Sequence, residues 1–282
     1  MFIVTGASGT LGSLVVDQLL ARVPAERIGV SVRDPDKVRA LAHRGVRVRH
    51  GDFDEPSTLA DAFAGATDVL IISAAAVGEL AVRRHATAIE AAKTAGARRI
   101  VYTSHMGAGL DSAFAPMPAH ARTEALLGAS GVPFVALRNG FYAASGRMVV
   151  GSAAETSELA APADGPVSWT AHADLAEAAA IVLTEPERLT GVTPPLTAGA
   201  ALDLADLARI ASERTGRPIR RVVVDDVTYR ERMLALQLPA PRVELLLGMF
   251  RASRAGEFAA VDPTLARLLG RAPRTMHDLA WA

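Results

Sequence analysis

The chain has 282 residues, half of them hydrophobic and 21% charged, so it can bury a sizeable core and is not of the disordered class. Lys and Arg together number 30 and balance 30 Asp and Glu, with no strongly basic or acidic block, which argues against general nucleic-acid binding. Cysteine is absent, which excludes disulfides, thiolate metal sites and cysteine catalysis.

A short apolar run at residues 2–4 leads into a glycine-rich loop and then into a helical pattern that begins near Leu11. Three glycines spaced three residues apart suit a dinucleotide: they allow a tight turn, a close approach of backbone to the pyrophosphate, and close helix–strand packing. The helix N-terminus attracts phosphates, and nearby hydroxyls add donors. An ordinary structural turn is the alternative. The residues expected to hold the pyrophosphate are Gly6, Ser8, Gly9, Thr10, Leu11 and Gly12.

A second strand is expected at residues 27–32, and it ends at Arg33. An acidic residue at this position would bind the ribose hydroxyl of NAD, whereas a guanidinium suits the 2′-phosphate of NADP. Lys37, one turn into the following helix, adds a second cation. Arg33 and Lys37 therefore favour NADP as the cofactor over NAD, the alternative being a solvated arginine.

Small and polar residues follow the next two strands, expected at 46–50 and 68–72. Asp52 and Phe53 lie where the adenine of a dinucleotide is expected, although this stretch also resembles a helix-capping turn. Ser73, Ala74 and Ala75 are small enough to let a cofactor pass close to the backbone.

Further strands are expected at 99–104, ending in Thr103 and Ser104, and at 134–137, running into Asn139. Strands alternate with helices from residue 2 to residue 142, which predicts an α/β fold, a Rossmann-like doubly wound parallel sheet. Ligands of such sheets lie at the carboxyl ends of the strands, so the residues named above should meet at one edge. We expect residues 1–142 to form the NADP-binding domain.

The second half, residues 143–282, is expected to be a smaller, mostly helical substrate lobe. Residues 143–166 read as a loop-rich excursion because they are rich in Ala, Ser, Gly and Pro. A helix over 172–184 is expected to pack back on the first domain. Further helices are expected at 202–215, 225–236 and 242–255, with a strand at 219–224.

The Tyr-x-x-x-Lys pair of short-chain reductases is absent. Residues Met106, Gly146 and Met233 stand four positions after the three tyrosines Tyr102, Tyr142 and Tyr229. This weakens the interpretation as a conventional alcohol dehydrogenase or sugar epimerase.

At the corresponding place the chain reads Ala-His-Ala-Arg-Thr-Glu over residues 119–124, preceded by Thr-Ser-His at 103–105 and followed by Leu-Arg-Asn-Gly-Phe-Tyr at 137–142. In these stretches the chain resembles the NmrA-like atypical short-chain reductases, and among them the bacterial type-2 NAD(P)H:quinone oxidoreductases and the triphenylmethane reductases. The likeness covers most of the chain. It implies an NADPH-binding reductase that passes a hydride to a quinone or another conjugated acceptor.

A reduced quinone is a delocalised oxyanion, so such an enzyme needs hydrogen-bond donors for the acceptor oxygens more than a strong acid. The catalytic candidates are Asn139, Tyr142 and His120. Each has a structural alternative: His120 could cap its helix or bind a ribose, Asn139 could fix the turn with Gly140, and Tyr142 could be pocket wall.

Three other polar residues are assigned structural roles. Glu124 is expected to pair with Arg122 or with backbone, and Arg138 to brace the end of its strand. Asp174 stands near the start of a helix, where the dipole favours a carboxylate.

Several classes of function find no support in the sequence. The 7 histidines show no pair at ligand spacing on one helix, so no metal site is expected, and there is no G-x-S-x-G nucleophile motif. No signal peptide or membrane span is apparent, and we expect a cytoplasmic protein. A homo-oligomer is left open.

The alternative function is an NADP-binding redox sensor that regulates a partner without chemistry, as the NmrA namesakes do. A tailoring reductase of a biosynthetic pathway is a third possibility.

Overall fold

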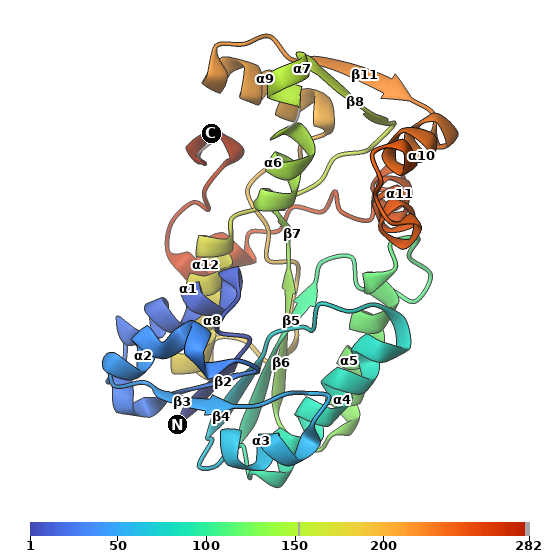
Figure 1. The fold of residues 1–282 in the computed structure, drawn as a ribbon. Helices are drawn as coiled ribbons and strands as arrows, with labels where there is room; N and C mark the ends of the chain where they lie inside the picture. Colours follow the sequence, from blue (N-terminus) through green and yellow to red (C-terminus); the bar gives the residue numbers. More distant parts are fainter. Residues whose placement is uncertain (152, 280–282) are drawn as a thin grey trace.

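The computed structural model describes residues 1–151 and 153–279, and its lower part in Figure 1 is built on a seven-stranded sheet in which every pairing is parallel. The order β10-β6-β5-β4-β1-β2-β3 reverses direction between β1 and β4. This confirms the predicted doubly wound fold and places the switch point beside the glycine loop. The strands are β1 (Phe2–Thr5), β2 (Ile28–Val32), β3 (Arg47–His50), β4 (Asp68–Ile71), β5 (Arg99–His105), β6 (Phe134–Asn139) and β10 (Gly191–Val192).

Helices cover both faces of this sheet because its central strands, such as β1 and β4, are apolar and buried on both sides. Val4 and Val101 pack with α1 (Thr10–Leu20) and α8 (His172–Thr184) on one face. The alternate residues Ile3 and Ile100 pack with helices on the other face, which are α3 (Pro56–Ala62), α4 (Gly78–Thr94) and α5 (Pro116–Ala129). Short helical turns connect the early strands: η1 (Ala25–Arg27), η2 (Pro35–Val38) and α2 (Arg39–His43).

The upper part of Figure 1 has a hydrophobic core of its own, in which Phe141, Trp169, Phe250 and Phe258 are buried. Two short parallel pairs, β7–β9 and β8–β11, replace the large sheet here. The elements are β7 (Phe141–Tyr142), α6 (Ala143–Gly151), α7 (Ala153–Thr156), β8 (Glu158–Pro162), β9 (Trp169–Thr170), α9 (Leu204–Thr215), β11 (Arg220–Val224), α10 (Asp226–Ala235) and α11 (Ala240–Arg254).

The prediction of a loop-rich excursion at 143–166 is wrong. The described residues of this stretch form α6, α7 and β8 before the chain becomes irregular. Alanine favours helix, and Val150 and Leu159 are buried in the upper core, so tertiary packing orders a segment whose composition resembles a loop. The later helices and the strand β11 lie close to their expected positions, whereas the two-residue strand β10 is too short to have been recognised.

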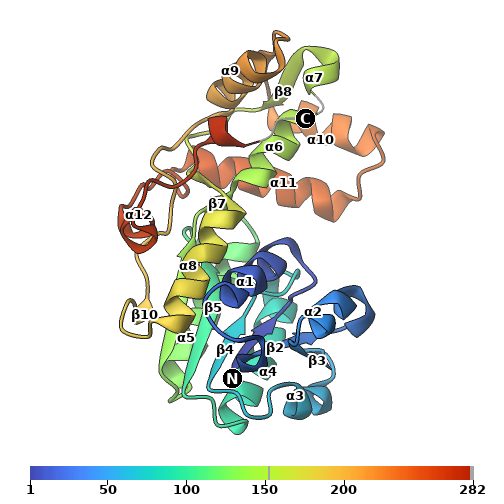
Figure 2. The same ribbon diagram turned by 90° about the vertical axis from the view of Figure 1, so that its left-hand side faces the viewer.

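The second half of the chain returns to the sheet. Figure 2 shows α8 beside α1. The helix α12 (Thr264–Leu269) also packs against α8. Leu175 and Leu265 lie in the same buried cluster as Val15 of α1. A short helix, η3 (Met276–Asp278), follows near the end of the described chain.

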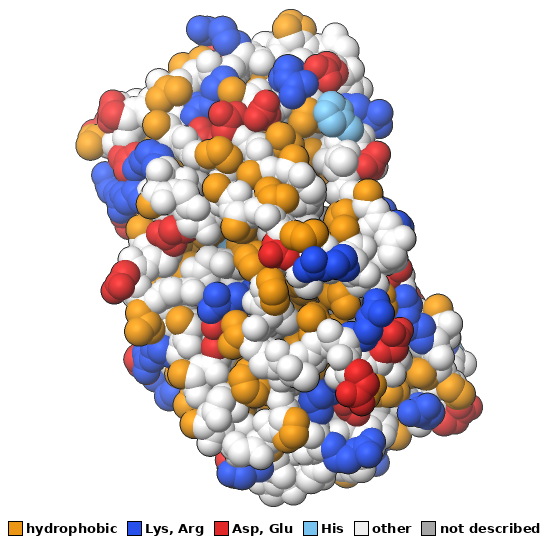
Figure 3. All heavy atoms as spheres, turned by 180° about the vertical axis from the view of Figure 1, so that it is seen from behind, with side chains coloured by type: hydrophobic (Ala, Val, Ile, Leu, Met, Phe, Trp, Pro, Cys, Tyr) orange, Lys and Arg blue, Asp and Glu red, His pale blue; other side chains and the backbone are white. Residues whose placement is uncertain are grey.

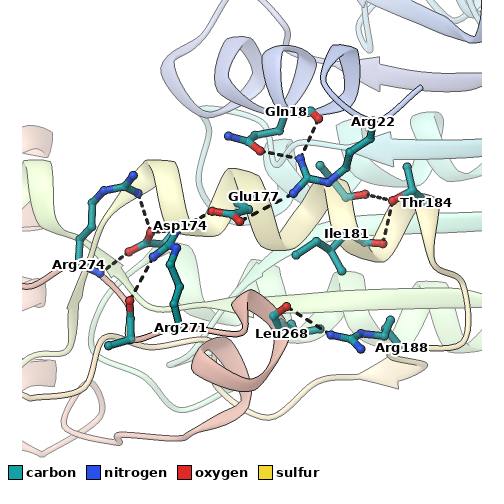
Figure 4. A network of polar contacts seen from close by, with 12 residues as sticks. Gln18, Arg22, Asp174, Glu177, Ile181, Thr184, Arg188, Leu268, Arg271 and Arg274 are labelled. Carbon is teal, nitrogen blue, oxygen red and sulfur yellow. Dashed lines mark hydrogen bonds and ion pairs between the residues drawn. The ribbon is translucent and has the colours of Figure 1, made fainter. Parts of the chain in front are cut away.

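Asp174, in the first turn of α8, is the centre of a polar network (Figure 4). Its carboxylate is completely buried and accepts bonds from Arg271 Nη2 at 2.9 Å and Arg274 Nη1 at 2.6 Å. It also accepts from the backbone N–H of Arg274 at 2.6 Å. Glu177, one turn later, binds Arg271 and lies 3.8 Å from Arg22 of the α1 end. Asp174 therefore does more than open its helix, because it attaches the C-terminal segment to α8.

No helix within residues 1–151 and 153–279 has both the length and the apolar character needed to cross a bilayer. On the face drawn in Figure 3, acidic and basic side chains are interspersed, in keeping with a formal net charge of zero.

Removing the charge of Asp174 should weaken the whole fold. We expect Asp174→Asn to lower the free energy of unfolding by about 3 kcal/mol, because it breaks a buried charge network. Glu177→Gln, a partly exposed member of the same network, should cost less than about 1 kcal/mol. Urea unfolding of the two variants measures this, and equal transition midpoints would contradict the assignment.

Candidate functional site

The glycine loop closes tightly over the end of β1. Gly6 has a φ of +62° and its N–H donates to Ser31 O at 3.3 Å, while Gly9 N–H donates to Gly6 O at 3.0 Å. A Cβ on Gly12 would lie 2.3 Å from the Gly6 carbonyl oxygen, so a side chain is sterically forbidden there. Gly9 precedes α1 without a side-chain cap, and the N–H groups of the first turn are left for a ligand.

A cavity of about 320 Å³, here called cavity A, lies in front of this loop at the carboxyl ends of β1, β2, β3 and β4. Nine of its lining residues were predicted from the sequence. They are Gly6, Ser8, Gly9, Arg33, Asp52, Phe53, Ser73, Ala74 and Ala75. Their meeting at one edge follows from the parallel topology.

The other predicted cofactor residues lie outside cavity A. Thr10, Leu11 and Gly12 form the first turn of α1, behind the loop. Lys37 is 70% exposed and lies 3.8 Å from Asp34, so it is a surface residue of the η2 turn rather than a second cation in the cavity.

Thr103 and Ser104 are also buried away from cavity A. The Thr103 hydroxyl accepts from Ser73 N–H at 2.9 Å, and Ser104 Oγ donates to Glu124 at 2.6 Å. Thr103 therefore supports the cavity wall from behind, and Ser104 orients a buried carboxylate.

The sequence prediction missed the remaining lining residues of cavity A, which are Thr5, Ser31, Val32, Gly51, Ile72 and Arg84. Ser31 and Arg84 are the two of these that bear on ligand binding. Ser31 Oγ is buried, with no hydrogen-bond partner among the described residues, and the one available signal was a lone hydroxyl inside the apolar strand β2. Arg84 arrives from α4 and binds Asp54 through two bonds of 2.9 and 2.6 Å. No motif near Arg84 in the sequence indicates a binding role, because only the packing of α4 brings this side chain to the edge of the sheet at cavity A.

A chain of buried hydrogen bonds leads from cavity A to α5. Ala74 N–H donates to His85 Nε2 at 2.9 Å, so the proton of this imidazole lies on Nδ1. His85 Nδ1 then donates to Thr123 Oγ1 at 2.9 Å, and Thr123 donates onward to Ala119 O. Burial, and after it the electrostatic effects of His120 and Arg84, lower the pKa of His85 to about 3, so the ring is neutral.

Tyr102 connects this chain to His120. Because His85 Nδ1 already carries a proton, the Tyr102 hydroxyl, 3.4 Å from it, donates instead to His120 Nδ1 at 2.8 Å. Burial raises the pKa of Tyr102, which keeps the donor protonated. Burial also lowers the pKa of His120 to about 4. His120 is therefore a neutral imidazole with its hydrogen on Nε2, which no described residue binds.

His120 and His85 line a second cavity of about 410 Å³, here called cavity B, together with Ala119 and Pro116 of α5. Cavity B shares Ala74 and Ala75 with cavity A, so the two meet beyond the end of β4. Arg242 and Leu245 of α11 form its wall from the upper lobe. His120, a catalytic candidate from the sequence, thus lines cavity B, and its catalytic role stays a prediction.

His105 lies at the end of β5, its ring centre 6.1 Å from that of His120. Its Nδ1 accepts from Gly107 N–H at 3.1 Å, which again leaves the proton on Nε2. Burial, followed by the charge of His120, lowers the pKa of His105 to about 3. Two neutral imidazoles therefore stand side by side at this edge.

Asn139 and Tyr142 lie outside both cavities. Asn139 is buried and its Oδ1 has no partner among the described residues, while its carbonyl accepts from Met106 N–H at 2.8 Å. Burial raises the pKa of Tyr142, a hydrogen bond from Asn139 opposes this, and the ring lies 4.1 Å from that of His172. Neither residue therefore lines cavity A or cavity B, and their catalytic role stays a prediction.

The expected pairing of Glu124 with Arg122 is wrong. Glu124 is buried and binds Arg138 through two bonds of 2.9 and 2.7 Å, so Arg138 does brace the strand end. Arg122 reaches instead to Glu79 at the start of α4. On α5, residues 122 and 124 point in different directions, which explains the exchange of partners.

No group of three or more His, Asp or Glu side chains in the described part of the chain is placed to hold a metal ion.

A family model described as NAD(P)H-binding matches residues 6–186. The chain belongs to this NAD(P)H-binding family. It is 31% identical to quinone oxidoreductase 2 of Escherichia coli (strain K12), over 99% of this chain and 96% of that one. The structure of an NADPH-dependent quinone oxidoreductase of Escherichia coli complexed with NADPH matches with a TM-score of 0.93 at 30% identity, covering 99% and 98% of the two chains.

A Citrobacter sp. triphenylmethane reductase complexed with NADP(H) matches with a TM-score of 0.90 at 31% identity, over 99% of this chain and 98% of that one. The resemblance stated from residues 103–142 is thus confirmed, as is the expectation of a nicotinamide dinucleotide cofactor at the level of the family.

The three histidines near cavity B should remain neutral well below neutral pH. We expect the ring resonances of His85, His105 and His120 to stay constant from about pH 8 to about pH 5, where an ordinary imidazole titrates. NMR of the folded protein measures this, and a midpoint above about pH 6 for His120 would contradict the hydrogen-bond chain.

The same shifts make stability depend on pH. The unfolded chain binds these protons near pH ~6.5 but the folded chain does not, so stability is complete above that pH and falls as the pH drops below it. Urea unfolding at a series of pH values measures this. The free energy of unfolding should fall less steeply with decreasing pH in His120→Gln than in the wild type.

Proposed function

We propose that this NAD(P)H-dependent reductase uses NADPH to reduce a quinone or a similar conjugated acceptor. Residues 1–142 would hold the dinucleotide, and residues 143–282 would complete the acceptor site from above. The observation that carries the proposal is the junction of cavity A with cavity B, where a neutral imidazole with a free N–H donor lines the wall.

The residues of cavity A fit a dinucleotide phosphorylated on its adenosine. The glycine loop and the uncapped end of α1 would receive the pyrophosphate. Ser31 Oγ is a buried polar atom in need of a partner, and Asp52 and Phe53 would border the adenine. Arg33 and Arg84 supply positive charge at the far end, and Asp54 holds Arg84 in place. NADPH, when bound, supplies the hydride.

The protein's task in cavity B is to bind acceptor oxygens as negative charge develops on them. His120 would donate its Nε2–H to such an oxygen without losing the proton, since the ring is neutral and Tyr102 occupies Nδ1. A fixed neutral donor stabilises an oxyanion by electrostatics rather than by proton transfer. This suits a quinone, whose reduced form spreads its charge over the ring, and it accounts for the missing Tyr-x-x-x-Lys pair.

The alternative function, a sensor that binds NADP and regulates a partner without chemistry, would not need a donor in cavity B. The His85–Thr123 and Tyr102–His120 hydrogen bonds are more elaborate than cofactor binding requires. They favour the reductase.

Replacing Arg33 should change the choice of cofactor. We expect Arg33→Ala to raise the KM for NADPH roughly tenfold to a hundredfold, the value of one or two charge-assisted bonds, and to leave the KM for NADH within about twofold. Lys37→Ala is the matched control, because Lys37 lies outside cavity A, and it should alter neither KM. If Arg33→Ala raised the KM for NADPH and the KM for NADH equally, Arg33 would have no role in selecting NADPH.

Reduction of small quinones tests the function itself. The wild type should oxidise NADPH when a quinone is added, and His120→Phe should lower kcat roughly a hundredfold, as loss of one oxyanion donor does. Tyr102→Phe should lower kcat less, roughly tenfold, because His120 keeps its proton but loses the partner that holds it on Nε2. NADPH affinity, measured by calorimetry, should remain unchanged in both variants. No turnover by the wild type across quinones, dyes and enones would reject the reductase.

A further inference from the structure

A third hollow of about 600 Å³ lies in the upper lobe, between α6, β8, α10 and α11. Its lining is mostly apolar and includes Met148, Leu159, Met233, Leu236 and Leu246. A volume of this size is typical of small-molecule sites. None of the roles assigned above uses this hollow, here called the upper groove.

The upper groove adjoins cavity B through α11. Arg242 lines both, and the successive residues Leu245 and Leu246 face cavity B and the groove respectively. Figure 1 shows α11 standing above α5 and the start of α4, the elements that carry His120 and His85. A molecule with its reactive ring in cavity B can therefore extend past Arg242 into the groove.

The chemistry of the lining changes where cavity B meets the upper groove at Arg242. The Arg242 side chain has no hydrogen-bond or ion-pair partner among the described residues, so its guanidinium is available to an oxygen of a bound molecule. Beyond it, large apolar side chains remain in water: Met148 is 70% exposed and Leu236 is 68% exposed. Exposed apolar surface of this kind is stabilised by an apolar ligand, and flexible methionines adapt to its shape.

We propose that the acceptor is amphipathic, with a ring that is reduced in cavity B and a long hydrocarbon side chain that lies in the upper groove. Arg242 marks the point where the polar ring ends and the chain begins, its own methylenes covering the first part of the chain. This inference rests on the proposed reductase function and specifies its substrate class.

The test uses one naphthoquinone ring that carries no side chain or a butyl, hexyl or octyl chain, below the concentration at which the octyl compound aggregates. In the wild type, the KM should fall on the order of twofold to fourfold for each added methylene, while kcat changes little. A KM that is independent of chain length would overturn the inference.

Exposed residues of the groove provide variants that should fold normally. Leu236→Asp and Met148→Asp should remove most of the dependence on chain length and leave the KM of the chain-free ring unchanged. Val227→Asp is the matched control: Val227 is 58% exposed on α10 but does not line the groove, so the full dependence should remain. Equal effects of Val227→Asp and Leu236→Asp would count against the groove.

Calorimetric titration of the octyl compound into the protein without cofactor separates the two proposals. Binding that Leu236→Asp weakens supports the groove even if no quinone is reduced, in which case the reductase fails and the lipid-like ligand stands. Turnover of the chain-free ring with no dependence on chain length rejects the groove alone. A fall in molecular mass of Leu236→Asp by light scattering would identify the groove as an interface between copies and overturn the inference.

Discussion

The contact between α1 and the glycine loop sets the position of α1 and of the elements that pack on it. With no Cβ on Gly12, the helix packs directly on the Gly6 carbonyl, where a Cβ would be only 2.3 Å away. α8 packs on α1, and Asp174 of α8 binds the C-terminal segment through Arg271 and Arg274. The same steric constraint therefore shapes the glycine loop and, through two layers of packing, anchors the part of the chain that follows the upper lobe.

A second dependence links the two cavities. Ala74 belongs to the wall that cavities A and B share, and its N–H decides on which nitrogen His85 carries its proton. This leaves the Tyr102 hydroxyl to His120, whose Nε2–H is then available in cavity B. Burial keeps all of these groups neutral, so the arrangement holds a directed donor without a charge. Such a site suits the proposed acceptor, which would take a hydride and spread the resulting charge.

Local patterns predicted the first half of the chain well, because parallel strands alternating with helices place their carboxyl ends together whatever the details of packing. They failed where tertiary packing decides. The Ala-rich stretch after Tyr142 resembles a loop, yet it forms α6 and β8 against the upper core. Lys37 has the right spacing from the glycines but turns to Asp34, whereas Arg84, distant in sequence, reaches cavity A.

The sequence by itself determined the sheet, the glycine loop, the position of Arg33 at the end of β2 and the family, since each depends on residues close together in the chain. The tertiary structure alone decided that Asn139 and Tyr142 are withdrawn from the cavities, and that Tyr102 and His85 orient His120. It also decided that α11 joins cavity B to an apolar groove. The physical reason is that hydrogen-bond direction and cavity shape arise from elements far apart in the sequence, which no local spacing records.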